Sequence, residues 1–246
     1  MTLKSDHFKG KDVYEHLKEA RARGAKATQE IHGTEAPGHL VAATDSLKET
    51  AIILLGFWIL LLAFRASAPV TLLAIFSIGW ILWKGGRSAL LGWGRLERLH
   101  RLIEEERYEI QHHRAQEKKE LRGMYEQKGF TGELLDQVVE VLMADDNRLL
   151  RVMLEEELGL TLETYEHPLK QAVGAAVGAF IAGIGALIGA FFAGMWGITI
   201  VLLLLFSIAT LVTAKREGNA LIKSLIWNLA VGILSIGTLY FISQLR

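Results

Sequence analysis

The feature that most constrains this chain is a series of long apolar stretches without a charged residue. Residues 51–64, 70–83, 172–213 and 224–242 contain no Asp, Glu, Lys or Arg, whereas residues 84–170 carry most of the charge. Alternating apolar and charged segments of this length are typical of a polytopic membrane protein. A soluble fold would have to bury such helices on every face, which a chain of 246 residues rarely achieves. We therefore predict an all-α membrane protein.

The apolar stretches predict five transmembrane helices. A spanning helix needs about 20 residues, so the first span must extend back towards residue 42. The block 171–213 is long enough for two spans that separate near residues 194–197. Lys and Arg are concentrated in the N-terminal region, in the insert between spans two and three, and at Lys215 and Arg216. No signal peptide is evident, and this distribution predicts that the N-terminus and the insert are cytoplasmic.

The predicted organisation has four parts. These are a cytoplasmic N-terminal region (1–40), transmembrane helices one and two (41–86), a cytoplasmic helical metal-binding domain (87–168), and transmembrane helices three to five (169–243). The chain has no cysteine, which excludes disulfides and thiolate metal sites. Carboxylate, imidazole and thioether groups remain as possible ligands.

Two features of the spans have functional implications. Span three carries small residues in one helical stripe, which predicts close packing against a partner helix; they are Gly174, Gly178, Ala182, Gly185 and Gly189. Asp45 and Glu49 lie four residues apart, on one face of the first span at its inner edge. Since ionisable residues in a membrane commonly mark an ion path, we expect these two carboxylates to form its entry.

The charged insert predicts three helices. Residues 87–127 lack Pro and have Gly only near their ends, so we expect one long helix that continues out of the membrane. Residues 133–145 form an amphipathic pattern after Thr131, a plausible N-cap. A third helix is expected over residues 148–158, after a break at residues 145–147.

Acidic residues gather on one face of the long predicted helix. At about 100° per residue, one arc of about 80° contains four carboxylates and an imidazole: Glu106, Glu109, His113, Glu117 and Glu120. A charged run of this kind is usually a solvated helix face, and that interpretation stays open. However, like charges at i,i+4 destabilise a helix, and a multivalent cation would compensate for them.

The third predicted helix provides further candidate ligands. Met153 and Glu157 are one turn apart, so a thioether and a carboxylate face the same way. Oxygen-rich ligands with one thioether and one imidazole suit Fe²⁺ or Mn²⁺, with Zn²⁺ or Co²⁺ as alternatives. No organic cofactor is expected.

These motifs resemble the vacuolar iron transporter family and the related Ca²⁺-sensitive cross-complementer-like Fe²⁺/Mn²⁺ transporters. The matching elements are Glu106-x-x-Glu109, Glu117-x-x-Glu120-Leu, the segment YEQKGF and the segment MLEEELGL. The resemblance covers about residues 40–243. It implies a homodimer whose cytoplasmic three-helix domain collects divalent metal between subunits. It also implies that the membrane part moves Fe²⁺ or Mn²⁺ out of the cytosol in exchange for protons.

Carried over by position, the resemblance makes metal ligands of six residues: Glu106, Glu109, Glu117, Glu120, Met153 and Glu157. One ligand position of the family is Leu154 here, and Glu155 or Glu156 are possible substitutes. His113 is a candidate from helical geometry alone. In the membrane, Asp45 matches an expected Asp, whereas the expected Met of span two falls near Trp83-Lys84 and span three lacks the family's prolines.

Three functions remain open from the sequence. The first is a divalent metal transporter, which is not an enzyme. The second is a membrane-anchored, ferroxidase-like protein that sequesters iron, since Glu109 and His112 form a Glu-x-x-His pair. The third is a scaffold with a charged stalk and no metal. The expected partners are the lipid bilayer, divalent metal ions and a second copy of the chain, without nucleic acid. A bacterial cytoplasmic membrane and an organelle (vacuole-like) membrane fit equally well.

Overall fold

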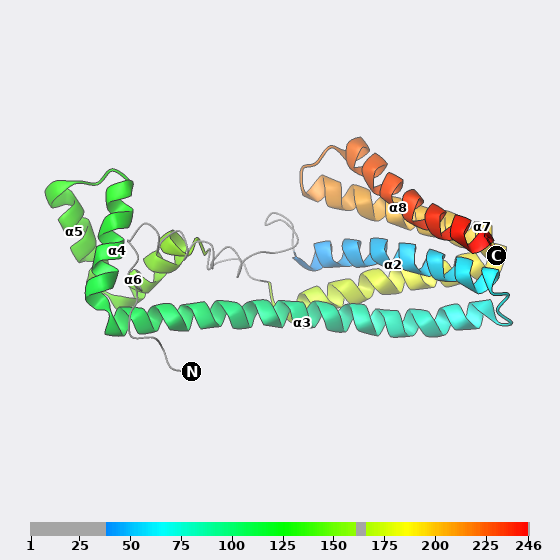
Figure 1. Ribbon diagram of the computed structural model, residues 1–246, viewed down its shortest axis with the longest axis horizontal. Helices are drawn as coiled ribbons and strands as arrows, with labels where there is room; N and C mark the ends of the chain where they lie inside the picture. Colours follow the sequence, from blue (N-terminus) through cyan, green and yellow to red (C-terminus); the bar gives the residue numbers. More distant parts are fainter. Residues whose placement is uncertain (1–37, 161–165, 246) are drawn as a thin grey trace. The chain divides into compact units, whose positions relative to one another are not determined.

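The computed structural model describes residues 38–160 and 166–245, all of whose regular elements are helices (Figure 1). The predicted N-terminal region, 1–40, lies outside the described residues except for its last three. The helices are α2 (Gly38–Ala63), α3 (Pro69–His112), α4 (Arg114–Gln127), α5 (Gly132–Met143), α6 (Asp146–Val152), the π-helical turn η1 (Met153–Glu157), α7 (Pro168–Arg216) and α8 (Leu221–Gln244).

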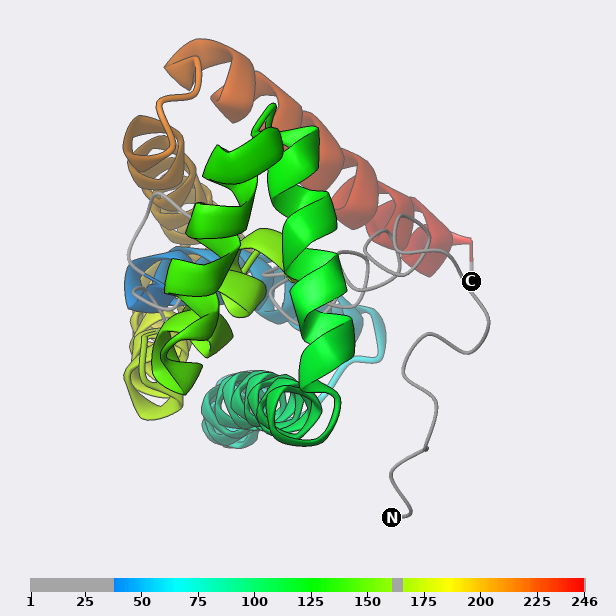
Figure 2. The ribbon, with the colours of Figure 1, turned by 90° about the vertical axis from the view of Figure 1, so that its left-hand side faces the viewer.

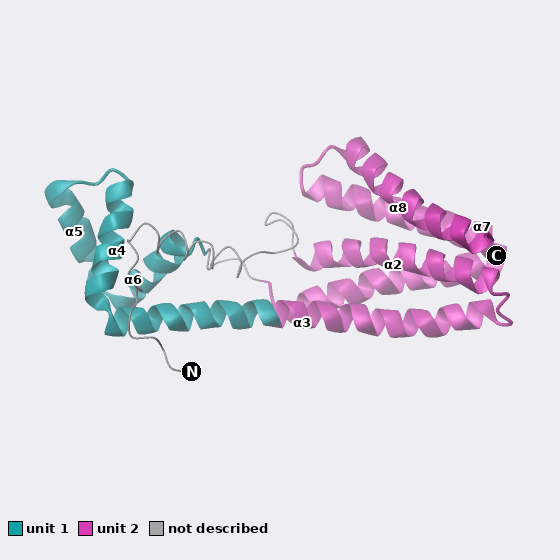
Figure 3. Ribbon diagram, in the orientation of Figure 1, with its two compact units in different colours: residues 1–30, 94–165 teal, residues 31–93, 166–246 magenta. Residues whose placement is uncertain are grey.

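The chain divides into two compact units, coloured separately in Figure 3. Among the described residues, unit 1 comprises residues 94–160, and unit 2 comprises residues 38–93 and 166–245. Helix α3 contributes its first part to unit 2 and its last part to unit 1. The charged insert and the apolar helices therefore form separate cores.

In unit 2, glycines let α7 approach α2 until the two backbones touch. A Cβ atom on Gly174 would lie 2.1 Å from the carbonyl oxygen of His39, and one on Gly178 would lie 2.0 Å from that of Ala43. Only a residue without a side chain fits at such positions, because a Cβ atom this close to backbone would force the helices apart. The small-residue stripe thus packs against a partner helix, as predicted.

Helix α7 is a hairpin of two helices. Ala193 (φ −141°, ψ 19°) and Gly194 (φ 54°, ψ −131°) leave the helical conformation, and Gly194 takes a positive φ that suits glycine. A Cβ atom on Gly189 would lie 2.6 Å from the carbonyl oxygen of Gly197, so the two halves pack against each other beside the turn. The predicted break near residues 194–197 is confirmed.

Four helices are long and apolar enough to cross a membrane by length and composition: α2, α3, α7 and α8. Much of their apolar surface is exposed; Ile75, Phe192 and Leu234 are examples. None of the described residues of α8 is buried. An aqueous solvent would oppose so much exposed apolar area, whereas lipid tails accommodate it.

The prediction of a single helix over residues 87–127 is wrong. Helix α3 ends at His112 and α4 begins at Arg114, because His113 between them has non-helical angles (φ −126°, ψ 29°). The break turns α4 so that Leu121 and Met124 join Ile110 in one hydrophobic core. Burial of this apolar face outweighs the continuation of a helix that no Pro or Gly interrupts.

The remaining elements of unit 1 complete that core. Helices α4 and α5 lie side by side as an antiparallel pair (Figure 2), and α5 contributes Leu135 and Val139 to the core. Thr131 occupies the N-cap position of α5 but makes no capping hydrogen bond with its side chain. The third predicted helix begins at Asp146, two residues before the predicted start at residue 148. Asp145 is its N-cap and accepts a hydrogen bond from the backbone N–H of Arg148 (2.8 Å).

Candidate metal centre

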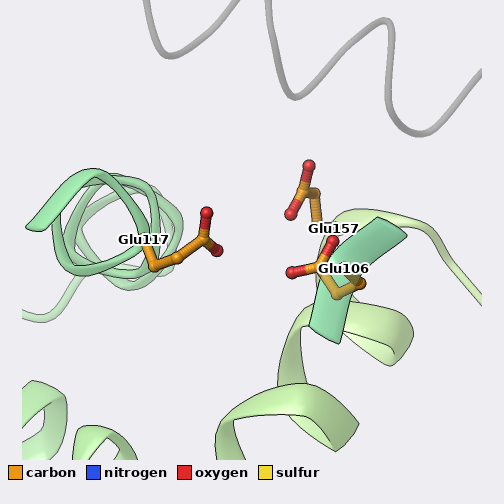
Figure 4. Close-up of side chains that lie close together, drawn as sticks. All are labelled: Glu106, Glu117 and Glu157. Atoms are coloured by element: carbon orange, nitrogen blue, oxygen red, sulfur yellow. The ribbon is translucent and has the colours of Figure 1, made fainter. Parts of the chain in front are cut away.

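Three glutamates from separate elements of unit 1 converge on one point (Figure 4). They are Glu106 on α3, Glu117 on α4 and Glu157 on η1, and one carboxylate oxygen of each lies within 4.8 Å of the other two. Their exposed fractions are 4%, 0% and 2%. Carboxylates on a solvated helix face would be exposed, so these three form a buried cluster rather than a solvated stripe.

The break at His113 brings the first two glutamates together. Glu106 precedes the break by two turns and Glu117 follows it by one, so each presents its side chain from a different helix. The angular calculation for one continuous helix therefore does not describe their geometry. Ile110 of α3 and Leu121 of α4 belong to the same hydrophobic core, so the packing of this core positions the two helices that carry the glutamates.

The π-helical turn supplies the third glutamate. The backbone N–H of Leu158 donates to the carbonyl oxygen of Met153 at 3.2 Å, the i→i+5 spacing of a π helix. This wider turn buries Met153, Leu154 and Glu157 together. Such turns occur frequently at functional sites, and nothing in the sequence of this segment predicted one.

The site concentrates negative charge where water is excluded. Burial, and then the charges of Glu157, Glu117, Glu109 and Glu120, raise the pKa of Glu106 well above the usual value of 4.5. Among the described residues, Oε1 of Glu106 accepts no hydrogen bond. A buried carboxylate of this kind is stable only when protonated or when a cation lies beside it. The three-glutamate cluster is therefore suited to exchange protons for a cation.

The other predicted ligands lie at different depths. Glu120 is fully buried on α4, and Glu109 is half-buried on α3; both are close enough to influence the ionisation of Glu106. Met153 is also fully buried, and it packs among the apolar residues of the core. The structure thus surrounds the three-glutamate cluster with two further carboxylates, and it places the thioether in the adjoining core.

His113 and the possible substitutes for a ligand at Leu154 lie outside the three-glutamate cluster. His113 occupies the helix break, half-buried, with its ring 6.4 Å from that of Tyr108. Leu154 is buried in apolar contacts, Glu155 is exposed, and Glu156 forms an ion pair with Lys128. This arrangement does not support the expectation that Glu155 or Glu156 takes the place of a metal ligand at position 154.

The histidine of the Glu-x-x-His pair also points elsewhere. His112 is exposed, its ring stacks on Tyr108 with centroids 4.0 Å apart, and its Nδ1 lies 2.9 Å from the carbonyl oxygen of Tyr108. It does not belong to the three-glutamate cluster. A cluster of carboxylate oxygens favours hard divalent cations such as Mn²⁺, and it also suits Fe²⁺, a borderline case.

Asp45 and Glu49 line a separate cavity within unit 2, of about 600 Å³. Each carboxylate lies beside a lysine: the Lys48 ammonium is 2.8 Å from Oδ1 of Asp45, and the Lys84 ammonium is 2.6 Å from Oε2 of Glu49. The sequence places Lys48 near Asp45 by its spacing. It offers no local signal for the pair between Glu49 and Lys84, which are 35 residues apart.

Comparison with known proteins identifies the family of the chain. A family model described as the VIT family matches residues 94–244, more than half of the chain. No individual curated protein matches the chain. Members of this family are transporters rather than enzymes, and they move metal ions across membranes. The chain belongs to the vacuolar iron transporter (VIT) family and is an integral, multi-pass membrane protein.

Proposed function

We propose that this protein exports Fe²⁺ or Mn²⁺ from the cytosol in exchange for protons, and that unit 1 collects the metal. The observation that carries the proposal is the burial and convergence of Glu106, Glu117 and Glu157. Three ionised carboxylates this close together in a buried cluster would repel one another, so the metal-free cluster retains protons. A divalent cation binds to the ionised carboxylates and releases those protons. The metal is the cargo of the protein, and Zn²⁺ and Co²⁺ are possible alternative cargoes.

The proposed topology has five spans. They are α2, the first part of α3, the two halves of α7 and α8, with the hairpin turn at Gly194 on the far side of the membrane. The Lys- and Arg-rich segments then lie on the cytoplasmic side together with the N-terminus and unit 1. The host is a bacterial cytoplasmic membrane or a vacuole-like organelle membrane.

Further groups complete the proposed path. Glu109, Glu120, Met153 and His113 assist the three-glutamate cluster as metal approaches or leaves. Asp45 and Glu49 receive the ion at the inner edge of the membrane. The active form is a homodimer, which would bring two copies of the collecting unit together.

Sequestration of iron without transport is the alternative function. It requires a histidine beside the carboxylates to build a ferroxidase-like site, but His112 is exposed and stacked on Tyr108. Family membership supports transport instead. Consumption of oxygen on addition of Fe²⁺, without metal flux, would establish the alternative.

Purified protein in dye-loaded proteoliposomes tests the proposal. We expect Mn²⁺- or Fe²⁺-dependent quenching above that of empty liposomes, and strong loss of this signal in the Glu106→Ala/Glu117→Ala variant. The matched control is Glu126→Ala/Glu140→Ala, which removes two exposed acids of the same unit. Absence of flux in the unmodified protein, or equal flux in all three proteins, would refute the proposal.

A further inference from the structure

The cavity of unit 2 brings acidic and basic groups together at the inner edge of the spans. Its walls come from α2, α3, α7 and α8, and its polar residues include Asp45, Lys48, Glu49 and Asn228. Two tryptophans, Trp80 and Trp227, also line it. With Lys84 beside Glu49, the two acids and two lysines have a formal net charge of zero.

Lys84 occupies the position that a cation would take at Glu49. Its side chain reaches from α3 to α2, where the ammonium lies 2.6 Å from Oε2 of Glu49. The side chain of Lys84 is 9% exposed, whereas that of Glu49 is 57% exposed. The carboxylate therefore faces the open cavity, and the lysine approaches it from the packed side.

A second polar contact holds α3 against α2 at the same level. The indole Nε1–H of Trp80 donates to Oγ1 of Thr50 at 3.0 Å. Trp80 precedes Lys84 by one helical turn, and Thr50 follows Glu49 directly. Because two neighbouring contacts fix the same pair of helices, the ammonium is held in place rather than free to choose among acceptors.

We propose that Lys84 is a tethered cation that competes with the transported metal for Glu49. A divalent cation cannot bind Glu49 while an ammonium lies in contact with the same carboxylate, because two positive charges would then be close together in a partly buried site. Entry of the metal requires the Lys84–Glu49 pair to break. Lys84 thus sets both the affinity and the access of this step, and the inference rests on the proposed transport function.

Lys48 provides the internal comparison. It pairs with Asp45 at i,i+3 on the same helix, and no second helix is involved. Because both partners lie on α2, this pair can rearrange without a change in the packing of α2 against α3. Lysine carries its charge on a flexible four-carbon stem, so Lys48 can move aside without separating α2 from α3. We expect the loss of Lys84 to alter metal binding more than the loss of Lys48.

The test measures Mn²⁺ binding to the full chain in detergent by electron paramagnetic resonance and calorimetry. The background variant Glu106→Ala/Glu117→Ala/Glu157→Ala removes the three-glutamate cluster of unit 1. Adding Lys84→Met should create one further Mn²⁺ site, at least tenfold tighter than any Mn²⁺ binding that remains in the background. Adding Glu49→Gln as well should abolish that site, and Lys84→Arg should leave the background unchanged. Lys48→Met should give a smaller gain, and Lys223→Met, an exposed lysine outside the cavity, none.

A folded Lys84→Met variant without the additional Mn²⁺ site would overturn the proposal, as would a gain that survives Glu49→Gln. Thermal unfolding in detergent reports folding, and Lys84→Gln, which retains a hydrogen-bond donor, replaces Lys84→Met should the latter fail to fold. Flux in proteoliposomes separates this proposal from the proposed function. Lack of flux in the unmodified protein refutes transport alone, since the Mn²⁺ measurement at Glu49 still decides the role of Lys84.

Discussion

The two units of this protein place their carboxylates in opposite electrostatic settings. In unit 1, Glu106, Glu117 and Glu157 lie against one another. In unit 2, Asp45 and Glu49 each lie within 2.8 Å of a lysine ammonium. The first arrangement concentrates negative charge, whereas the two acids and two lysines of the second have a formal net charge of zero. Under the two proposals above, unit 1 attracts metal, and unit 2 admits it only after a lysine has moved.

Removing the three-glutamate cluster should have the largest effect on metal binding. Glu106→Ala/Glu117→Ala/Glu157→Ala should weaken Mn²⁺ binding by about 1,000-fold, or about 4 kcal/mol, because three carboxylate ligands are lost from one site. Calorimetry on the full chain in detergent measures this change. Affinity within threefold of that of the unmodified protein would show that metal binds elsewhere, and would remove the contrast between the units.

Packing provides a second contrast between the units. In unit 2, α7 packs closely against α2 because glycines at the contact have no side chain, whereas in unit 1 apolar side chains form the core that holds the helices. Gly178→Ala should destabilise the protein by about 1–3 kcal/mol, because its Cβ atom would lie 2.0 Å from the carbonyl oxygen of Ala43. The control is Gly79→Ala on α3, where a Cβ atom meets nothing within 4 Å; it should be neutral or slightly stabilising. Thermal unfolding in detergent compares the two variants, and equal stability would contradict a close contact between α2 and α7 at Gly178.

The raised pKa of Glu106 predicts how unit 1 responds to pH. The pKa of Glu106 in the folded state lies above the usual Glu value of 4.5. Glu106 therefore contributes to the stability of the metal-free protein below pH 4.5, and this contribution is lost as pH rises through the raised pKa. Metal binding requires the ionised form, so Mn²⁺ affinity should rise in the same window, by at most about tenfold per pH unit for one proton.

Mn²⁺ titrations at a series of pH values above 4.5 measure this dependence. Glu106→Gln should reduce the slope, whereas Glu126→Gln, an exposed acid on α4, should leave it unchanged. A slope that persists fully in Glu106→Gln would assign the proton to another group. Lys84→Met should not alter the slope of unit 1, because it belongs to the other unit.

The smallest expected effect concerns the segment that supplies Glu157. Asp145→Ala should lower stability by about 1 kcal/mol, because its carboxylate accepts the backbone N–H of Arg148 at the start of α6. Asp145→Asn keeps an acceptor and should retain most of the stability. Chemical denaturation of unit 1, followed separately from that of unit 2, measures the loss. Equal effects of Ala and Asn would exclude capping as the cause.

Local patterns in the sequence were sufficient for much of the fold. Long apolar stretches without charged residues predict membrane helices, and the small residues of span three predict close packing against a partner helix, which the structure identifies as α2 for Gly174 and Gly178. The motifs around Glu106, Glu117 and Glu157 identified the family, and residues 194–197 marked the turn of the α7 hairpin. Each of these signals acts over a few residues, so it can be read without knowing what lies elsewhere in the chain.

Tertiary structure alone decided how the site is assembled. No Pro or Gly marks His113 as a helix break, and the break exists because the change of direction lets Leu121 and Met124 of α4 join Ile110 of α3 in one core. The π turn that buries Glu157 and the pairing of Lys84 with Glu49 likewise depend on partners distant in sequence. The sequence by itself determined which residues are apolar, acidic or small. Long-range packing decided which carboxylates face one another and which face a lysine. The energy of that packing comes from residues far apart in the sequence, so no local pattern predicts it.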